Sequence, residues 1–372
     1  MMENMMQLYV ASLLLISFAC TCMLCGASSN VKGGYYPDWA SDYASIDASL
    51  FSHVFYAFIS PNQDTFSFDV SDSAASKYND FTSTLHAKNP PLKTLISIGG
   101  GGSDPAFYAK MASQQSSRKT FIDSSISVAR AYNFDGLDLD WESPANQNEM
   151  DDLGQLFKEW RDAINAEAQS SGKPPLLLTA AVYFAVDFFL EDNRKYPVAS
   201  INQNVDWINV MSYDYHGSWD TSATGAPAAL YDPKSKVSTS YGLNSWVNGG
   251  LLKSKVVMGL PLYGRTWKLK DASDHGIGAP SVGVGPGDDG TLSYSEVENF
   301  NAQNSATVVF DQDTVSTYSY AGVSWIGYDD VLSTNAKVKY ARNLGLGGYY
   351  FWSINQDPDS KVTSQASSTW DS

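Results

Sequence analysis

Eight short runs of apolar residues, rich in β-branched and aromatic side chains, recur along the chain after residue 30. Such runs are typical of buried strands, and the longer segments between them have apolar residues at helical spacing. The clearest helical segment has apolar residues three or four positions apart, at Met150, Leu153, Leu156, Phe157, Trp160 and Ile164. The eight runs are Gly33–Tyr36, His53–Ile59, Lys93–Gly99, Phe134–Trp141, Leu176–Val182, Asp206–Ser212, Lys255–Pro261 and Gly347–Trp352. Their alternation with helices predicts an α/β fold class, a closed (β/α)8 TIM barrel.

The spacing of the runs is broken once, between Pro261 and Gly347. This segment is too long for one helical crossover, is rich in glycine and contains short strand-like pieces such as Ala306–Phe310. A structureless loop of that length is unusual in a compact domain. We therefore expect a small inserted subdomain at residues 263–328, between strands seven and eight, and a barrel formed by residues 28–262 and 329–372.

The N-terminal segment differs in composition from the rest of the chain. Residues 8–27 are almost wholly apolar, and the only three cysteines of the chain lie at Cys20, Cys22 and Cys25. Small residues around Ala27 fit a signal-peptidase site, which predicts a signal peptide at residues 1–27 and a secreted protein. A membrane anchor is the alternative, because about 20 apolar residues can span a bilayer. The residues before the apolar segment also include Glu3 and no basic residue, whereas a signal peptide usually begins with positive charge. After cleavage the chain has no thiol and no expected association with a membrane.

The charge balance limits the partners of the protein. The chain has 24 basic and 40 acidic residues, a formal net charge of −16. Nucleic-acid binding requires clustered Lys and Arg, so we expect no nucleic-acid partner. Hydrophobic residues make up 43% of the sequence, enough for a large core, and we expect a monomer.

The fourth apolar run has acidic residues at every second position. The period of two in a strand places Asp138, Asp140 and Glu142 on one face, and the apolar residues between them on the other. Glu142 comes last, at the carboxyl end where barrel active sites lie, and burial together with like charges raises the pKa of such a group. A carboxyl group that keeps its proton near neutral pH is suited to general acid catalysis. Acidic strand ends also bind Ca²⁺ or Mg²⁺, but no asparagine partners cluster nearby, so no metal and no cofactor is expected.

The acidic strand resembles a known family signature. Asp135, Asp138, Asp140 and Glu142 match the DxxDxDxE motif of glycoside hydrolase family 18. Further segments match this family in order along the chain, and the whole is similar to the plant class V chitinases. These segments are Ser97–Gly100, Met211–Asp214, Gly259–Arg265, Trp325–Asp330 and Trp352. The resemblance implies an α+β insertion that forms one wall of the substrate cleft.

The resemblance also implies an endo-acting chitinase that retains the anomeric configuration by substrate assistance. Glu142 would be the general acid and base, and Asp140, Asp138 and Tyr213 would stabilise the reacting acetamido group. The expected substrate-binding residues are Trp352, Tyr35, Ser97, Gly99, Asp214, Met211, Arg265 and Tyr183. Asp135 lies out of phase with the acidic column, and we interpret it as structural. The expected partners are chitin and chitooligosaccharides, and the expected location is the apoplast or a vacuole.

Two alternatives remain open at this point. The segment Phe184–Leu190 is unusually apolar for a loop beside a sugar cleft. It either binds the lipid of a lipochitooligosaccharide, with Phe188 and Phe189 as the test positions, or packs against the barrel rim. A non-catalytic chitin-binding lectin is the alternative of another class, because fold alone does not establish catalysis.

Overall fold

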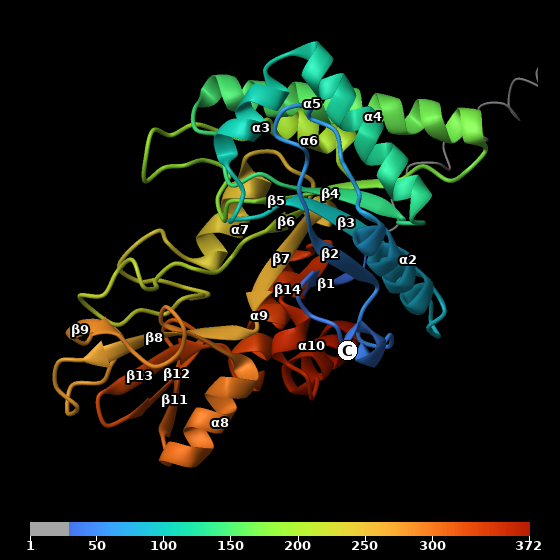
Figure 1. Ribbon diagram of the computed structural model, residues 1–372. Coiled ribbons are helices and arrows are strands. Elements are labelled where there is room, and N and C mark those ends of the chain that lie inside the picture. Colours follow the sequence, from blue (N-terminus) through green and yellow to red (C-terminus); the bar gives the residue numbers. More distant parts are fainter. Residues whose placement is uncertain (1–29) are drawn as a thin grey trace, which may run out of the picture.

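The computed structural model describes residues 30–372, and the predicted signal peptide lies outside the described residues. Eight strands form a closed barrel in the order β1-β14-β7-β6-β5-β4-β3-β2, with every neighbouring pair parallel (Figure 1). The predicted (β/α)8 barrel is thus confirmed. The barrel strands are β1 (Val31–Pro37), β2 (His53–Ile59), β3 (Lys93–Gly99), β4 (Gly136–Asp140), β5 (Leu177–Val182), β6 (Trp207–Val210), β7 (Val256–Pro261) and β14 (Gly348–Trp352).

Helices follow most of the barrel strands and cover the outside of the barrel (Figure 1). They are α2 (Asp72–His86), α3 (Pro105–Ala112), α4 (Gln115–Ala131), α5 (Gln147–Ser171), α6 (Val198–Asn204), α7 (Thr239–Asn248), α9 (Val331–Leu344) and α10 (Lys361–Asp371), with short 3-10 turns at Tyr43–Ser45, Lys253–Lys255 and Ile354–Gln356. The longest helix, α5, starts where the Asn146 side chain accepts a hydrogen bond from the Glu149 N–H, and ends before Gly172 at φ 70°. Its apolar face is buried against the barrel, as the periodicity from Met150 to Ile164 predicts.

Residues 263–328 form a separate antiparallel sheet that lies below the barrel in Figure 1. Its strand order is β10-β8-β13-β12-β11, and β9 pairs with β8. The elements are β8 (Tyr263–Leu269), β9 (Ser281–Val284), β10 (Thr291–Ser293), α8 (Tyr294–Asn304), β11 (Thr307–Asp311), β12 (Ser316–Ala321) and β13 (Ser324–Tyr328). A small core of its own holds this sheet together, with Trp267 and Trp325 edge to face at 5.4 Å between ring centroids.

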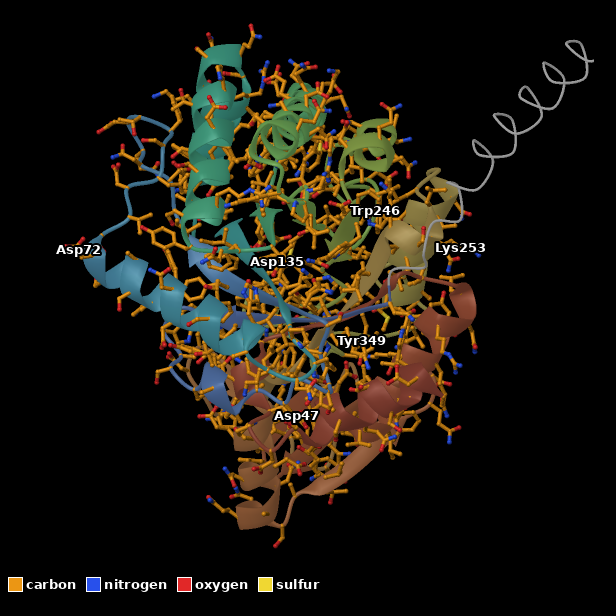
Figure 2. All side chains as sticks on the ribbon, turned by 90° about the vertical axis from the view of Figure 1, so that its right-hand side faces the viewer. Asp47, Asp72, Asp135, Trp246, Lys253 and Tyr349 are labelled. Atoms are coloured by element: carbon orange, nitrogen blue, oxygen red, sulfur yellow. The ribbon has the colours of Figure 1, made fainter. Side chains whose placement is uncertain are left out.

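The strands of the barrel have an apolar cluster on each side, one outside the barrel and one inside it. The larger cluster lies mainly between the strands and the helices, where side chains fill the space between them (Figure 2). The smaller one lies inside the barrel and consists of Val31, Tyr35, Phe55, Ala57, Leu95, Trp207, Val257 and Tyr350. The interior of the barrel is therefore a packed core.

Asp135 comes directly before β4, at the opposite end of the strand from Glu142 (Figure 2). Its carboxylate accepts hydrogen bonds from the Lys93 side chain at 2.7 Å and from the Thr94 N–H at 2.9 Å, and His86 lies 2.9 Å away. These contacts, with Lys93 above all, hold the pKa of Asp135 below its ordinary value although burial opposes them. The geometry agrees with the structural interpretation of Asp135.

Candidate active site

Strand β4 places its acids inside the barrel. Asp138 is 0% exposed and Asp140 is 5% exposed, whereas Leu137 and Leu139 pack in the outer apolar layer. Glu142 follows the end of the strand and is open to a cavity that it lines together with Asp140. The alternation of β4 thus lines up the three carboxyl groups from the barrel interior to its carboxyl end.

Three hydroxyl groups hold Asp138 in one orientation. Tyr35 and Ser97 donate hydrogen bonds to its Oδ2 at 2.8 and 2.7 Å, and Thr179 donates to its Oδ1 at 2.6 Å. Burial raises the pKa of Asp138, and the three donors oppose that rise. Both oxygens of Asp138 are therefore engaged, by residues of the neighbouring strands β3 and β5 and by Tyr35 of β1, which does not border β4.

Asp140 and Glu142 share a hydrogen bond, so the pKa of each carboxyl group depends on the protonation of the other. Burial raises the pKa of Asp140 well above its ordinary value, and the charges of Glu142 and Asp138 raise it further. Burial also raises the pKa of Glu142, although its hydrogen bond with Asp140 opposes this, and the charge of Asp214 adds to the rise. The pair therefore keeps a proton at a pH where exposed carboxyl groups have lost theirs. Asp140 Oδ1 is buried without a hydrogen-bond partner, which leaves the Asp140 carboxyl group less satisfied than that of Asp138.

The cavity at the carboxyl end of the barrel has a volume of about 500 Å³. The structure brings eight of the predicted site residues together in its wall: Tyr35, Asp140, Glu142, Tyr183, Met211, Tyr213, Asp214 and Trp352. The remainder of the wall consists of Phe58, Gly101, Ala181, Phe184, Leu190, Tyr215, Trp219 and Val237. A larger hollow at the opposite end of the barrel includes Asp135 and Lys93 in its wall but none of the three stacked acids. The acids identify the smaller cavity as the candidate active site.

An aromatic surface forms the floor of this cavity. The Trp352 indole stacks on Phe58 with ring centroids 5.6 Å apart and an interplanar angle of 25°. The edge of Tyr35 meets the same indole, with centroids also 5.6 Å apart. A flat apolar surface beside two carboxyl groups suits the apolar face of a pyranose ring.

A charged pair connects the cavity to the inserted sheet. Asp214 Oδ1 accepts a hydrogen bond from Arg265 Nε at 2.9 Å and lies 2.8 Å from Nη2 of the same guanidinium. Arg265 Nη1 donates to Thr291 Oγ1 at 2.8 Å. Arg265 belongs to β8 of the inserted sheet and is not part of the cavity wall. It therefore reaches the predicted site through Asp214.

Ser97, Asp138 and Gly99 are also outside the cavity wall. Ser97 is buried and contacts Asp138 as described above. Gly99 has φ 116°, and a Cβ at this position would lie 2.1 Å from the carbonyl oxygen of Asp140. Glycine is thus required for β3 to pass close to the end of β4.

The apolar loop after β5 contributes unequally to the cavity. Phe188 is 3% exposed, stacks on Tyr183 at 4.3 Å and is covered by the Arg194 guanidinium, 3.7 Å from its ring centroid. Phe189 packs edge to face on Tyr241 at 5.1 Å. The two proposed test positions for a lipid contact therefore pack against the rim. Leu190, by contrast, is 61% exposed and lines the cavity.

Two polar residues near the acids were missed by the sequence analysis. Thr179 bonds to Asp138, and Asn209 donates from Nδ2 to the Tyr35 hydroxyl at 2.9 Å. Both side chains point into the barrel from otherwise apolar strands, β5 and β6. A single polar residue at an inward position of a buried strand was the available signal.

Two kinds of feature are absent from residues 30–372: a cluster of metal ligands and a helix that could span a membrane. Within this range no group of three or more His, Cys, Asp or Glu side chains could hold a metal ion. In the same range, no helix combines the length and the apolar character needed to cross a bilayer.

Comparisons with known proteins agree with the geometry. Residues 32–357 match the model of the glycosyl hydrolases family 18. Nod factor hydrolase protein 1 of Medicago truncatula is 52% identical, over 92% of this chain and 91% of the relative. The class V chitinase of Nicotiana tobaccum in complex with NAG4 has 41% identity and a TM-score of 0.88, covering 92% of this chain and 99% of that one. The chitinase-like agglutinin of Robinia pseudoacacia has 40% identity and a TM-score of 0.85, over 91% and 99% of the two chains.

Proposed function

Because the chain belongs to family 18 of the glycosyl hydrolases and is similar along its length to class V chitinases, we propose that it cleaves β-1,4 linkages between N-acetylglucosamine units with Glu142 as general acid and base. The observation that carries this proposal is the coupled Asp140 and Glu142 pair at the aromatic floor of the cavity. A protonated carboxyl group there can donate to the glycosidic oxygen of a sugar stacked on Trp352.

The nucleophile in this proposal is the substrate itself. The carbonyl oxygen of the 2-acetamido group attacks the anomeric carbon while Glu142 protonates the leaving oxygen, which gives an oxazolinium ion. Asp140 lines the cavity beside Glu142, and its carboxylate accepts the acetamido N–H and stabilises the developing positive charge. Tyr213 donates its hydroxyl hydrogen to the acetamido oxygen from the cavity wall. Glu142 then removes a proton from a water molecule that attacks the anomeric carbon. This attack breaks the bond from the anomeric carbon to the acetamido oxygen, so the oxazolinium ring opens and the configuration is retained overall.

A carbohydrate-binding lectin is the competing function, because the Robinia pseudoacacia agglutinin has the same fold. The intact set of Asp138, Asp140, Glu142 and Tyr213 supports catalysis in this chain. The test is incubation of the mature protein with N-acetylglucosamine oligomers and chromatography of the products. Shorter oligomers are expected; binding without cleavage would support the lectin instead.

The pH dependence of this reaction follows from the raised pKa of Glu142. Activity requires the protonated acid, so it is lost as the pH rises through the pKa of the Asp140 and Glu142 pair. Replacing Asp214 by Asn removes a negative charge that raises the pKa of Glu142, and leaves the positive Arg265 nearby. We expect the basic limb of kcat/KM to move to lower pH in Asp214→Asn.

Profiles of kcat/KM against pH for wild type and Asp214→Asn measure this shift. Asp313→Asn is a suitable control, because Asp313 is exposed and outside the cavity wall. A basic limb that stays in place, or moves to higher pH, would refute the role of Asp214 in setting the proton affinity of Glu142.

A preference for lipochitooligosaccharides is the second candidate, favoured by the exposed Leu190 at the cavity and by the similarity to a Nod factor hydrolase. Phe184 and Val237 extend the same apolar wall. Burying a leucine against an acyl chain is worth about 1.5–3 kcal/mol. We therefore expect Leu190→Ser to reduce the ratio of lipidated to plain oligomer cleavage by about tenfold.

Competition assays with both substrates in one vessel measure this ratio directly. Leu252→Ser is the matched control, because Leu252 is also exposed but lies before β7, at the opposite end of the barrel. An unchanged ratio in Leu190→Ser would exclude a lipid contact at this position.

We propose further that residues 1–27 direct the protein to secretion, into the apoplast or a vacuole, as their apolar composition suggests. N-terminal sequencing of the protein purified from plant tissue tests this. A mature N-terminus near Ser28 would support cleavage, and a retained Met1 would contradict it.

A further inference from the structure

Tyr350 occupies an inward position of β14 that two glycines make possible. It is paired with Gly259 on β7 and with Gly33 on β1. A Cβ on Gly259 would lie 2.8 Å from the Tyr350 hydroxyl and 2.8 Å from the Tyr213 ring, and a Cβ on Gly33 would lie 3.0 Å from the Tyr350 Cβ. The adjacent strands thus leave space for a tyrosine pair inside the barrel.

The two tyrosine hydroxyls are in direct contact. Tyr350 Oη lies 2.9 Å from Tyr213 Oη, and the rings meet at 72° with centroids 6.3 Å apart. Tyr213 lines the cavity, whereas Tyr350 is 0% exposed and is not part of the cavity wall. Tyr213 therefore separates Tyr350 from the space that a substrate would occupy.

The geometry allows either hydroxyl to donate in this contact, and burial favours Tyr350 as the donor. A buried hydroxyl without an acceptor loses the free energy of its hydrogen bonds to water. Tyr350 has Tyr213 Oη as its acceptor within the described residues, while Tyr213 also faces the cavity and can donate into it. The favoured arrangement is Tyr350 to Tyr213, and Tyr213 to the cavity.

We propose that Tyr350 is a positioning residue that directs the Tyr213 hydroxyl hydrogen towards the acetamido oxygen of the substrate. The inference rests on the proposed function, in which Tyr213 donates to that oxygen. Accepting one hydrogen bond strengthens the next in a chain, so Tyr350 also makes Tyr213 a better donor as the acetamido group attacks. Tyr350 acts only through Tyr213 and does not touch the substrate.

The test is a double-mutant cycle on cleavage of N-acetylglucosamine oligomers. Tyr350→Phe removes one oxygen and leaves the ring in place. We expect it to lower kcat about fivefold to tenfold, with KM within about twofold, because one hydrogen bond in the transition state is lost. In the Tyr213→Phe background the same substitution is expected to change kcat by less than about twofold. A merely structural role of Tyr350 would instead give effects that add.

Two further variants make the result unambiguous. Tyr349→Phe, at the neighbouring position that packs outward against Trp370, is expected to keep wild-type kcat. Tyr350→Met also lacks the hydroxyl and is expected to show the same loss of kcat. It serves as the second variant if Tyr350→Phe does not fold well.

The outcomes separate the two proposals. If wild type cleaves and Tyr350→Phe retains its kcat, or if the effects of the two substitutions add, the inference is overturned while the proposed function stands. If wild type does not cleave, the proposed function fails and the inference fails with it.

Discussion

Replacing Glu142 by glutamine is expected to lower kcat on N-acetylglucosamine oligomers by about 10²–10⁴-fold, the range that general acid catalysis contributes. Glutamine keeps the size and the polar contacts of the side chain at the cavity but has no proton to give to the leaving oxygen. Since substrate binding depends mainly on the aromatic floor and the other wall residues, KM should change little. Initial rates at several oligomer concentrations separate the two constants.

Glu298→Gln serves as the control for this substitution. Glu298 is on α8 of the inserted sheet, where it pairs with Lys361 at the surface and lies outside the cavity wall. Such a pair contributes little to stability, so activity and thermal stability should remain as in wild type. A Glu142→Gln variant that retains most of the wild-type kcat would show that the acid is another group.

Replacing Lys337 by methionine is expected to destabilise the fold by about 3–5 kcal/mol, the loss that follows when one partner of a buried ion pair is removed. Lys337 on α9 and Asp329 at the end of β13 are essentially unexposed and form a salt bridge at 2.5 Å. Lys337 also donates to the Ala228 carbonyl in the segment between β6 and α7. The pair thus holds the residue that follows the inserted sheet against α9 and the segment after β6. Lys337→Met leaves the Asp329 carboxylate buried without an opposite charge.

Urea unfolding of wild type, Lys337→Met and the double variant Asp329→Leu/Lys337→Met measures this effect. The double variant removes both charges and is expected to lose less stability than Lys337→Met alone. Equal unfolding midpoints for wild type and Lys337→Met would show that Asp329 is neutralised in another way.

The sequence was sufficient for the parts of the fold and the site that depend on local pattern. The barrel strands follow from apolar runs, and the direction of Asp138 and Asp140 follows from the period of two in β4. The contacts around those acids come from strands far away in sequence, so Thr179 could not be assigned to Asp138, nor Asn209 to Tyr35. Such contacts depend on the register of the closed barrel, which no local signal specifies.

The apolar loop shows a second limit of sequence reasoning. Phe188, Phe189 and Leu190 are equally apolar neighbours, but Phe188 is enclosed by Tyr183 and Arg194 while Leu190 faces the cavity. Irregular backbone has no fixed period, so the side that each residue presents depends on tertiary packing. Tyr350 lies on the regular strand β14, but its proposed role also depends on tertiary packing, because its partner Tyr213 comes from a distant part of the sequence.

In the proposed mechanism the acetamido group of the substrate, and not a carboxylate of the protein, attacks the anomeric carbon, with Glu142 serving as acid and then base. Proton NMR of the products formed in the first minutes from an N-acetylglucosamine oligomer tests it most directly, when the same oligomer without its N-acetyl groups is run beside it. Attack by the acetamido group predicts a β-anomer at the newly formed reducing end and no cleavage of the deacetylated oligomer. A newly formed α-anomer, or equal cleavage of the deacetylated oligomer, would contradict it.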